Sequence, residues 1–260
     1  MSIPKGYVDP SYLQATAQLM KALKQRTYTQ MHVQPGQKVL DVGCGAGMDT
    51  LALAQVVGPG GHVVGVDYDQ GMVDEANRRG AQVSGGARLE HRQADATALP
   101  FASGEFDACR SERLFQHLPN PALAIAEMSR VTKSGGWIVV LDTDWGTLSI
   151  DTPEVDIERR LVRFQAERLV HNGYAGRQLY RLFKQQQLAE ITVEMHPGFS
   201  TSYAFGRQYV SLDAAEKNAL AAGVITADEL ARWHAALEQA EAANAFFSSV
   251  SMMLVAGRKP

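Results

Sequence analysis

The feature that most constrains this chain is a strand that runs directly into a glycine-rich turn. The stretch VLDVGCGAG, residues 39–47, places Gly43, Gly45 and Gly47 at alternate positions after a largely apolar run. Glycines are needed where a turn requires unusual dihedral angles and where a ligand lies so close to the backbone that a Cβ would collide with it. A helix after Gly47 would add free N–H groups and a positive dipole end, which suit a carboxylate or a phosphate. The turn therefore predicts an α/β fold with a ligand site at the end of this strand.

The spacing of the glycines excludes two common nucleotide-binding loops. A dinucleotide fingerprint needs glycine or alanine at position 48, where the chain has Met48. A P-loop needs a lysine followed by serine or threonine, and neither follows this turn. A nicotinamide-dependent dehydrogenase is therefore disfavoured.

Short apolar runs alternate with helical segments from about residue 38 to residue 142. This alternation is typical of βαβ units and predicts a doubly wound, mainly parallel sheet. In such a sheet ligands bind at the carboxyl ends of the strands. The predicted strands are Lys38–Val42, His62–Asp67, Arg88–Arg92, Phe106–Arg110 and Trp137–Asp142, and the predicted helices are Gly47–Val57, Gly71–Gly80 and Pro121–Thr132.

The flanking segments predict helices that cover the core. We divide the chain into an N-terminal lid helix (1–35), a core (36–150), a helical cap insertion (151–188) and C-terminal strands and helices that complete the sheet (189–260). In the N-terminal part, Leu19, Met20 and Leu23 lie on one face of a helix over Ser11–Met31. After the core, Thr152 and Pro153 start a helix that ends at Asn172, and a second helix follows to about Gln187. The C-terminal part has a strand over Glu190–His196 ended by Pro197, a capping box at Thr226–Glu229 and a closing strand over Phe246–Val255.

Composition excludes several functional classes. The 25 basic and 28 acidic residues give a net charge of −3, and no polybasic run is present, so no nucleic acid partner is expected. No apolar run approaches the roughly 20 residues that span a bilayer, and the N-terminus lacks a signal-like segment, so no membrane association is expected. The 2 cysteines, Cys44 and Cys109, build no disulfide framework, which favours a reducing, cytoplasmic location.

Asp67, at the end of the second predicted strand, indicates the kind of ligand. An acidic side chain at this place accepts hydrogen bonds from both hydroxyls of a ribose. The alternative role, N-cap of the helix over Gly71–Gly80, is compatible with ribose binding. Together with the glycine turn, Asp67 predicts a ligand that contains a ribose.

At this point the chain resembles a class I S-adenosylmethionine-dependent methyltransferase of the UbiE-like (methyltransferase type 11) family. The resemblance depends on VLDVGCGAG (39–47), GVDYDQGM (65–72), QADATALPF (93–101), FDACRSERLFQHLPNP (106–121) and RVTKSGGW (130–137). It implies a Rossmann-like methyltransferase fold with a seven-stranded sheet, S-adenosylmethionine as cofactor and S-adenosylhomocysteine as product.

The resemblance also implies the cofactor contacts. Positions that match the family motifs place the glycine turn along the methionine part of the cofactor and Asp67 at its ribose. The remaining implied contacts are Tyr68 and Met72 beside the adenine, Asp95 and Ala96 at its edge, and the backbone at Arg110 and Ser111 at the amino group. Met72 has core packing as an alternative role.

The acceptor side of the site follows less directly from the sequence. His117 is the candidate general base, or else a residue that bonds a backbone carbonyl and fixes its loop. Glu112 and Arg113 either bind a polar group of the acceptor or pair with each other or with a neighbour as a solvated rim. Trp145 after the fifth strand and Tyr28 of the lid helix suggest a flat or lipophilic acceptor.

We therefore expect a methyltransferase that acts on O, N or C of a small aromatic or lipophilic molecule. Transfer from a sulfonium is a direct displacement, so alignment and exclusion of water matter more than a base. The alternatives are a non-transferring reaction such as cyclisation, and a non-catalytic module that binds the cofactor. No metal is expected, because Asp142 and Asp144 lack a third ligand, and the histidines other than His117 receive no role.

Overall fold

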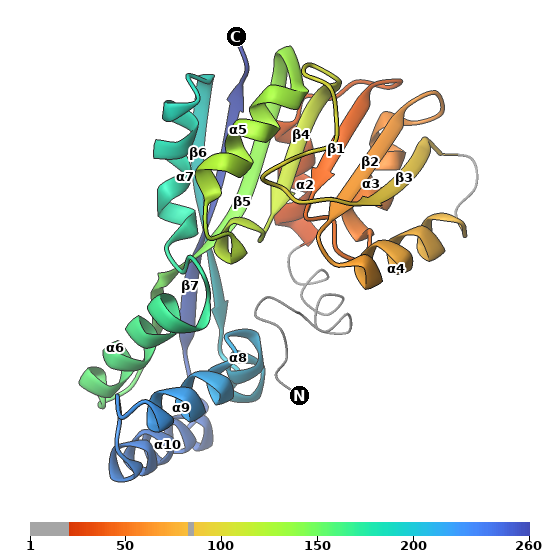
Figure 1. Ribbon diagram of the computed structural model, residues 1–260. Helices are drawn as coiled ribbons and strands as arrows, with labels where there is room; N and C mark the ends of the chain where they lie inside the picture. Colours follow the sequence, from red (N-terminus) through yellow and green to blue (C-terminus); the bar gives the residue numbers. More distant parts are fainter. Residues whose placement is uncertain (1–20, 83–85) are drawn as a thin grey trace.

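The computed structural model describes residues 21–82 and 86–260. Its sheet has seven strands in the order β3-β2-β1-β4-β5-β7-β6 (Figure 1). Neighbours among β1 to β5 are parallel, and β7 is antiparallel to β5 and β6, which confirms the predicted doubly wound, mainly parallel fold. The strands are β1 (Lys38–Val42), β2 (His62–Asp67), β3 (Arg88–Gln93), β4 (Phe106–Glu112), β5 (Thr132–Ile150), β6 (Ala189–Ser200) and β7 (Ser248–Arg258). The helices are α2 (Lys21–Gln30), α3 (Met48–Val57), α4 (Gln70–Gly80), α5 (Pro121–Val131), α6 (Val155–Phe164), α7 (Ala175–Gln185), α8 (Tyr203–Tyr209), α9 (Leu212–Ala221) and α10 (Ala227–Ala242), with a 3₁₀ turn η1 (Phe115–His117) and a short π-helix η2 (Gln165–Leu169).

Two hydrophobic cores lie on the two faces of the sheet. On one face, side chains of α5 and α7, such as Ile125 and Phe183, belong to a core that includes apolar residues of β1, β2, β4, β5 and β7, and α7 itself packs on β5 and β7. On the other face, Tyr28 and Met31 at the end of the first described helix pack with Leu53 of α3. Central parallel strands covered on both faces are predicted to be almost wholly apolar, and β1 fits this rule except at Lys38, its first residue, and at the buried Asp41.

A third core forms a separate lobe. Strands β5, β6 and β7 continue beyond the other strands, and α6, α8, α9 and α10 gather around their extended ends (Figure 1). Trp233 of α10 is fully buried at the centre of this lobe. We call these four helices the cap. The predicted insertion at 151–188 is thus divided, because α6 belongs to the cap whereas α7 covers the sheet.

Several predicted boundaries were wrong. The strand predicted over Trp137–Asp142 extends from Thr132 to Ile150, and the helix predicted to end at Asn172 ends at Phe164. The helix predicted from Thr152 begins at Val155, because the Thr152 hydroxyl instead accepts a hydrogen bond from the amide of Glu154 at 3.1 Å. The strand predicted to stop before Pro197 continues to Ser200. Proline is tolerated there because β6 is an edge strand and needs no amide donor on its open side.

The predicted lid helix is described only in part. Residues 11–20, with Leu19 and Met20, lie outside the described residues. The remainder is α2, which packs on the sheet through Tyr28 and Met31. Among the described residues, no helix combines the length and the apolarity needed to cross a bilayer.

Candidate cofactor and acceptor site

One large cavity opens at the carboxyl ends of β1, β2 and β4, with a volume of about 1620 Å³. Single-ligand pockets usually occupy about 300–1,000 Å³, so this cavity has room for two ligands side by side. One wall, which we call the strand-end wall, consists of residues 42–46, 66–72 and 94–97. The opposite wall, which we call the cap wall, consists of residues 113, 114, 116–120, 143, 145, 165, 169–171, 209–211, 214 and 218. Lys24, Asp49 and Glu112 line the cavity between the two walls.

The glycine turn forms the base of the strand-end wall. Gly43, Gly45 and Gly47 have φ values of 76°, 52° and 79°, in the left-handed region that favours glycine. Gly43 and Gly45 line the cavity, but Gly47 does not. A Cβ on Gly47 would lie 2.9 Å from the Cβ of Ala76, so this glycine permits close packing of the turn against α4. The three predicted glycines therefore divide into two at the cavity and one behind it.

Asp67 is held in place by the turn itself. Its Oδ2 accepts a hydrogen bond from the amide of Gly45 at 2.8 Å, and its Oδ1 accepts one from the amide of Asp69 at 3.0 Å. Burial raises the pKa of Asp67 despite these bonds. The N-cap of α4 is Asp69, whose Oδ1 accepts from the amide of Met72 at 3.1 Å, so capping is not the role of Asp67.

The residues predicted to surround an adenine lie together on the same wall. Tyr68 is 77% exposed and Met72 is 8% exposed, and both line the cavity. Asp95 and Ala96 follow β3 and line it too. The amide of Ala94 donates to the carbonyl of Asp67 at 2.9 Å, which fixes the loop after β3 beside the end of β2.

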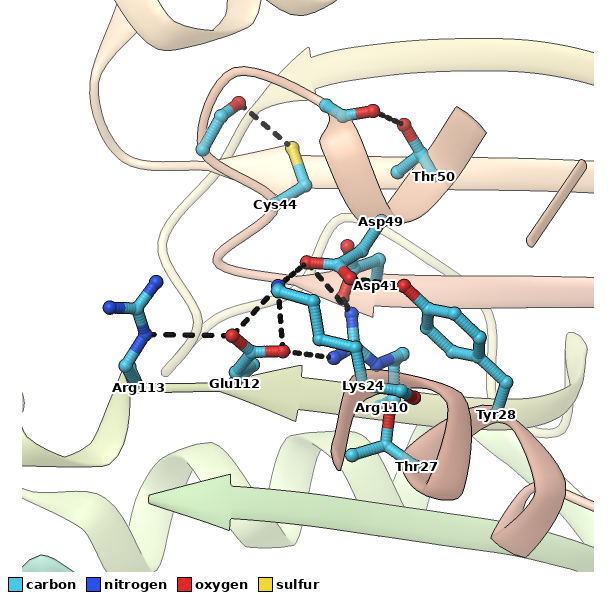
Figure 2. A network of polar contacts seen from close by, with 12 residues as sticks. Lys24, Thr27, Tyr28, Asp41, Cys44, Asp49, Thr50, Arg110, Glu112 and Arg113 are labelled. Atoms are coloured by element: carbon cyan, nitrogen blue, oxygen red, sulfur yellow. Dashed lines mark hydrogen bonds and ion pairs between the residues drawn. The ribbon is translucent and has the colours of Figure 1, made fainter. Parts of the chain in front are cut away.

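A buried ionic cluster lies beside the cavity (Figure 2), and three of its members, Lys24, Asp49 and Glu112, line it. Lys24 Nζ is 2.6 Å from Asp49 Oδ2 and 2.7 Å from Glu112 Oε1. Arg110 donates from Nη1 to Asp41 Oδ1 at 3.1 Å and from Nη2 to Glu112 Oε2 at 2.8 Å. We call these five residues the ionic cluster. It joins α2, β1, α3 and β4, and its three carboxyl groups outnumber its two cations.

Burial and charge affect the two aspartates of the cluster in opposite directions. Burial raises the pKa of Asp41, although Arg110 opposes that shift. Burial alone would also raise the pKa of Asp49, but the charges of Arg110 and Lys24 outweigh it and lower the pKa below its usual range. Asp49 also accepts a hydrogen bond from the Tyr28 hydroxyl. Asp49 and Glu112 are the two carboxyl groups of the cluster that line the cavity, where their negative charge favours a cationic group.

Besides Gly47, three predicted site residues do not line the cavity. Tyr28 is 6% exposed and lies behind Asp49, so it does not reach an acceptor directly. Arg110 is fully buried with its guanidinium 5.3 Å from the ring of Tyr28, and Ser111 is 1% exposed. The charged residues 110–113 at the end of β4 had suggested a solvated rim of the site. Arg110, the first of them, is instead a buried member of the ionic cluster.

The cap wall brings together segments that are far apart in the sequence. Trp145 lies where the pairing of β5 with β7 shifts register between Asp144 and Ser149, and its amide donates to the carbonyl of Gly173 at 2.8 Å. Its indole Nε1 donates to Gln116 Oε1 at 2.5 Å. These two hydrogen bonds hold the ring of Trp145 at the cavity, where an aromatic side chain was predicted.

The π-helix η2 connects this wall to the cap. Gln165 lines the cavity, and its Nε2 donates to the carbonyl of Val210 at 2.7 Å. Single-turn π segments inside α-helices are frequent at functional sites. Ser211, at the start of α9, lines the cavity with a positive φ of 53°.

His117 also lines the cap wall. Burial, the charge of Arg113 and the neighbouring His171 lower the pKa of His117 to about 4. Its ring makes no hydrogen bond to any described residue, so the loop-fixing bond to a backbone carbonyl is not seen within residues 21–82 and 86–260. His117 is therefore neutral at pH 7 and able to accept a proton.

Asp142 and Asp144 have structural partners. Asp142 Oδ2 accepts from the amides of Phe115 at 2.7 Å and Gln116 at 3.3 Å, which fixes the loop that contains His117. Asp144 accepts from Arg177 Nε at 2.5 Å. In the described part of the chain, no cluster of three or more histidine, cysteine or acidic side chains suits a metal ion.

Several residues at the site were missed by sequence reasoning. Lys24 and Asp49 had only a weak signal, a charged residue on an otherwise apolar face and an acid in the first turn after the glycines. His171 lines the cavity beside His117, contrary to the expectation that it has no role. The cap residues from Tyr209 to Asn218 had no signal, because only the tertiary fold brings α8 and α9 to the cavity.

Known proteins resemble both the core and the whole chain. Residues 40–140 match the family model described as a methyltransferase domain. The chain is 34% identical over 249 residues to an uncharacterized 37.1 kDa protein in transposon Tn4556 of Streptomyces fradiae, across 95% of this chain and 70% of that protein. It is 36% identical over 130 residues to a demethylmenaquinone methyltransferase of Staphylococcus aureus, across 50% of this chain and 53% of that enzyme. The chain thus spans about half the length of that enzyme.

The fold has solved counterparts. The YcgJ protein of Bacillus subtilis superposes with a TM-score of 0.64 at 20% identity, across 92% of this chain and 98% of that chain. At this level of identity the likeness concerns the fold. It extends beyond residues 40–140 to most of the cap.

Proposed function

This chain belongs to the methyltransferase-domain family, and from that premise we propose that it transfers a methyl group from S-adenosylmethionine to a small aromatic or lipophilic acceptor. The methylated atom is O, N or C. The observation that supports the proposal most strongly is the convergence of the glycine turn, Asp67 and Asp95 on one wall of a cavity large enough for two ligands.

The strand-end wall fits the cofactor chemically. A carboxylate has about four lone-pair sites, and Asp67 uses two for backbone amides, so two remain for the hydroxyls of a ribose. Asp95 would accept from the amino group of an adenine, and the amide of Ala96 would donate to its ring. Gly43 and Gly45 keep the turn free of Cβ atoms beside the methionine part. Tyr68 and Met72 supply apolar surface for the flat base.

The ionic cluster fits the opposite end of the cofactor. Its surplus of carboxyl groups suits the cationic amino and sulfonium groups of S-adenosylmethionine. When bound, the cofactor supplies a methyl group on a positively charged sulfur. The residues around it then need to align the acceptor, exclude water and, where the acceptor is protonated, receive its proton.

His117 is the residue that we assign to proton removal. It is neutral at physiological pH, lines the cap wall and has a ring free of hydrogen bonds to described residues. A carbon or nitrogen acceptor that has no acidic proton would need no such base. His117 therefore contributes only where the acceptor must be deprotonated.

The relative from Staphylococcus aureus supports an aromatic acceptor by its name, demethylmenaquinone methyltransferase. Trp145 and the apolar side chains of Leu118, Leu169 and Val210 on the cap wall agree with such an acceptor. The charged side chains of Glu112 and Arg113 beside them suggest a more polar molecule than a quinone.

The experiment combines the protein and S-adenosylmethionine with a metabolite extract of its source organism. Mass spectrometry should detect a compound that gains one methylene unit together with S-adenosylhomocysteine. The variant Asp67→Ala is the control and should give neither. Consumption of a compound without S-adenosylhomocysteine would instead indicate a non-transferring reaction such as cyclisation, and failure of the wild type to bind the cofactor in calorimetry would refute the proposal.

A further inference from the structure

Arg113 has an unusual backbone conformation that directs its side chain toward the cavity. It is the first residue after β4, with a φ of 52° in the left-handed region. Its amide donates to the carbonyl of Leu141 at 2.8 Å, and its carbonyl accepts from Gln116 Nε2 at 3.2 Å, so both backbone groups are fixed. Non-glycine residues in this region are uncommon and cluster at ligand and active sites.

The guanidinium of Arg113 is free to bind a ligand. Its Nε is buried without a hydrogen-bond partner, and its shortest contact with a carboxylate is 3.5 Å, from Nε to Glu112 Oε1. Neither Nη nitrogen donates a hydrogen bond to a residue that the structure describes. Figure 2 shows both Nη nitrogens pointing away from Glu112. Glu112 already binds Lys24 and Arg110, so it does not neutralise Arg113 by itself.

The other cations at the cavity are paired. Lys24 contacts two carboxylates of the ionic cluster. Arg79, on α4, donates to Glu75 at 2.6 Å. The described residues that line the cavity include one lysine, Lys24, and two arginines, Arg79 and Arg113. Of these three, Arg113 is the one without an acidic partner at hydrogen-bond distance.

The cap wall supplies no acid to balance this charge. Its described lining consists of apolar side chains, amides, hydroxyls and two histidines around Arg113. The acids of the cavity lie elsewhere, at Asp67, Asp69 and Asp95 on the strand-end wall and in the ionic cluster. The two Nη nitrogens of a guanidinium whose one ion pair is made by Nε, at 3.5 Å, remain available to an anion, and their planar fork matches the two oxygens of a carboxylate.

We propose that the acceptor carries a carboxylate that binds the two Nη nitrogens of Arg113. The proposal deepens the proposed function and rests on it, since it describes the acceptor of the same site. The substrate class is then a lipophilic organic acid, with its apolar part against Trp145 and Leu169 and its acidic group at the end of β4. The same fork would also suit the carboxylate of the cofactor, so the test must separate the two sources.

The test measures binding of matched acids and amides by calorimetry. The probes are benzoate with benzamide, 2-naphthoate with 2-naphthamide, and octanoate with octanamide, each titrated into protein saturated with S-adenosylhomocysteine. The variants are Arg113→Gln, which removes the charge, and Arg113→Lys, which keeps the charge without the fork. Arg79→Gln is the matched control, because Arg79 also lines the cavity but is already paired.

We expect at least one acid to bind the wild type about tenfold more tightly than its amide. Arg113→Gln should abolish that preference, Arg113→Lys should retain part of it, and Arg79→Gln should leave it unchanged. The affinity for S-adenosylhomocysteine should stay within about twofold in Arg113→Gln. A wild type that prefers none of the acids overturns the proposal.

A second outcome would assign Arg113 to the cofactor. The proposal is wrong if Arg113→Gln lowers the affinity for S-adenosylhomocysteine about tenfold and leaves the preference for the acid over its amide intact. If the wild type does not bind S-adenosylhomocysteine at all, the proposed function fails. The ratio of acid to amide affinity, measured on the free protein, then still decides whether Arg113 binds a carboxylate.

Discussion

The two walls of the cavity are built in different ways. The strand-end wall comes from residues 42–46, 66–72 and 94–97, each directly after a strand of the parallel sheet. The cap wall draws on loops after β4, a register shift in β5, the π-helix η2 and helices α8 and α9. A parallel sheet aligns its strand ends whatever their side chains, whereas the cap wall exists only when a separate hydrophobic lobe is in place.

The walls also differ in charge. Acidic side chains lie on the strand-end wall and in the ionic cluster, whereas the cap wall holds the neutral His117 and Arg113, whose Nη nitrogens have no acidic partner among the described residues. The first environment suits a cationic, ribose-containing ligand, and the second suits an anionic, lipophilic one. Variants that affect one wall and spare the other test this division.

The largest effect is expected for the ionic cluster. Arg110→Leu should lower the free energy of unfolding by about 3–5 kcal/mol, because it leaves three buried carboxyl groups without their shared cation. Chemical denaturation measures the change. Arg113→Leu is the matched control and should change it by less than about 1 kcal/mol, since its ion pair with Glu112 is long. Similar losses of unfolding free energy in both variants would contradict the assignment of Arg110 to a stabilising buried cluster and of Arg113 to the cavity.

The next effect concerns the strand-end wall. Asp67→Ala should lower the affinity for S-adenosylhomocysteine about hundredfold, because the ribose hydroxyls lose two hydrogen bonds to a charged carboxylate. Calorimetry measures the affinity, and circular dichroism should show an intact fold. Asp69→Asn is the control, since asparagine also caps a helix and should keep the affinity within about threefold. Unchanged affinity in Asp67→Ala would remove Asp67 from the site.

His117 tests the cap wall. His117→Gln should lower kcat about hundredfold for an acceptor that must lose a proton, as is typical of a removed general base. The affinity for S-adenosylhomocysteine should stay within about threefold, because His117 lies on the other wall. An unchanged kcat would show that the acceptor needs no base.

The pH dependence of kcat gives an independent test of the same residue. A base acts in its neutral form, and the lowered pKa of His117, about 4, keeps that form populated well below pH 6. In the wild type kcat should therefore stay level from pH 8 to about pH 5 and fall as the pH drops toward 4. In Arg113→Gln the fall should begin at a higher pH, because the charge of Arg113 helps to lower the pKa. A fall centred near the ordinary histidine pKa of about 6.5 in the wild type would contradict this environment.

The smallest effect is expected for the cap itself. Glu216 is buried and accepts from Arg207 Nη2 at 2.6 Å, Trp233 Nε1 at 2.7 Å and His234 Nε2 at 2.9 Å. Glu216→Gln should lower the free energy of unfolding by about 2 kcal/mol and raise the KM of the acceptor several-fold, with little change in cofactor affinity.

The control for the cap is Asp213→Asn. Asp213 also pairs with Arg207, but its side chain is 80% exposed, so its loss should change stability by less than about 0.5 kcal/mol. Equal changes in acceptor KM and cofactor affinity in Glu216→Gln would mean that the cap supports both walls.

Much of the strand-end wall could be predicted from local sequence. The glycine turn and Asp67 each lie at the end of a short apolar strand and Asp95 follows the polar strand β3, and the structure places Gly43, Gly45, Asp67 and Asp95 at the cavity. Arg110 could not be placed in this way. It lies in a charged run that suggested solvent, but its burial depends on Asp41, Asp49 and Glu112, which meet only in the folded chain.

The sequence by itself determined the order of strands and helices and the chemistry of the strand-end loops. Hydrophobic periodicity and glycine spacing act over a few residues, and a parallel sheet then brings successive strand ends to one edge. The tertiary structure alone decided which of two nearby arginines is buried and which lines the cavity, and which cap residues face the cavity. Those outcomes depend on desolvation and on charges from distant segments, and both are defined only once the chain has packed.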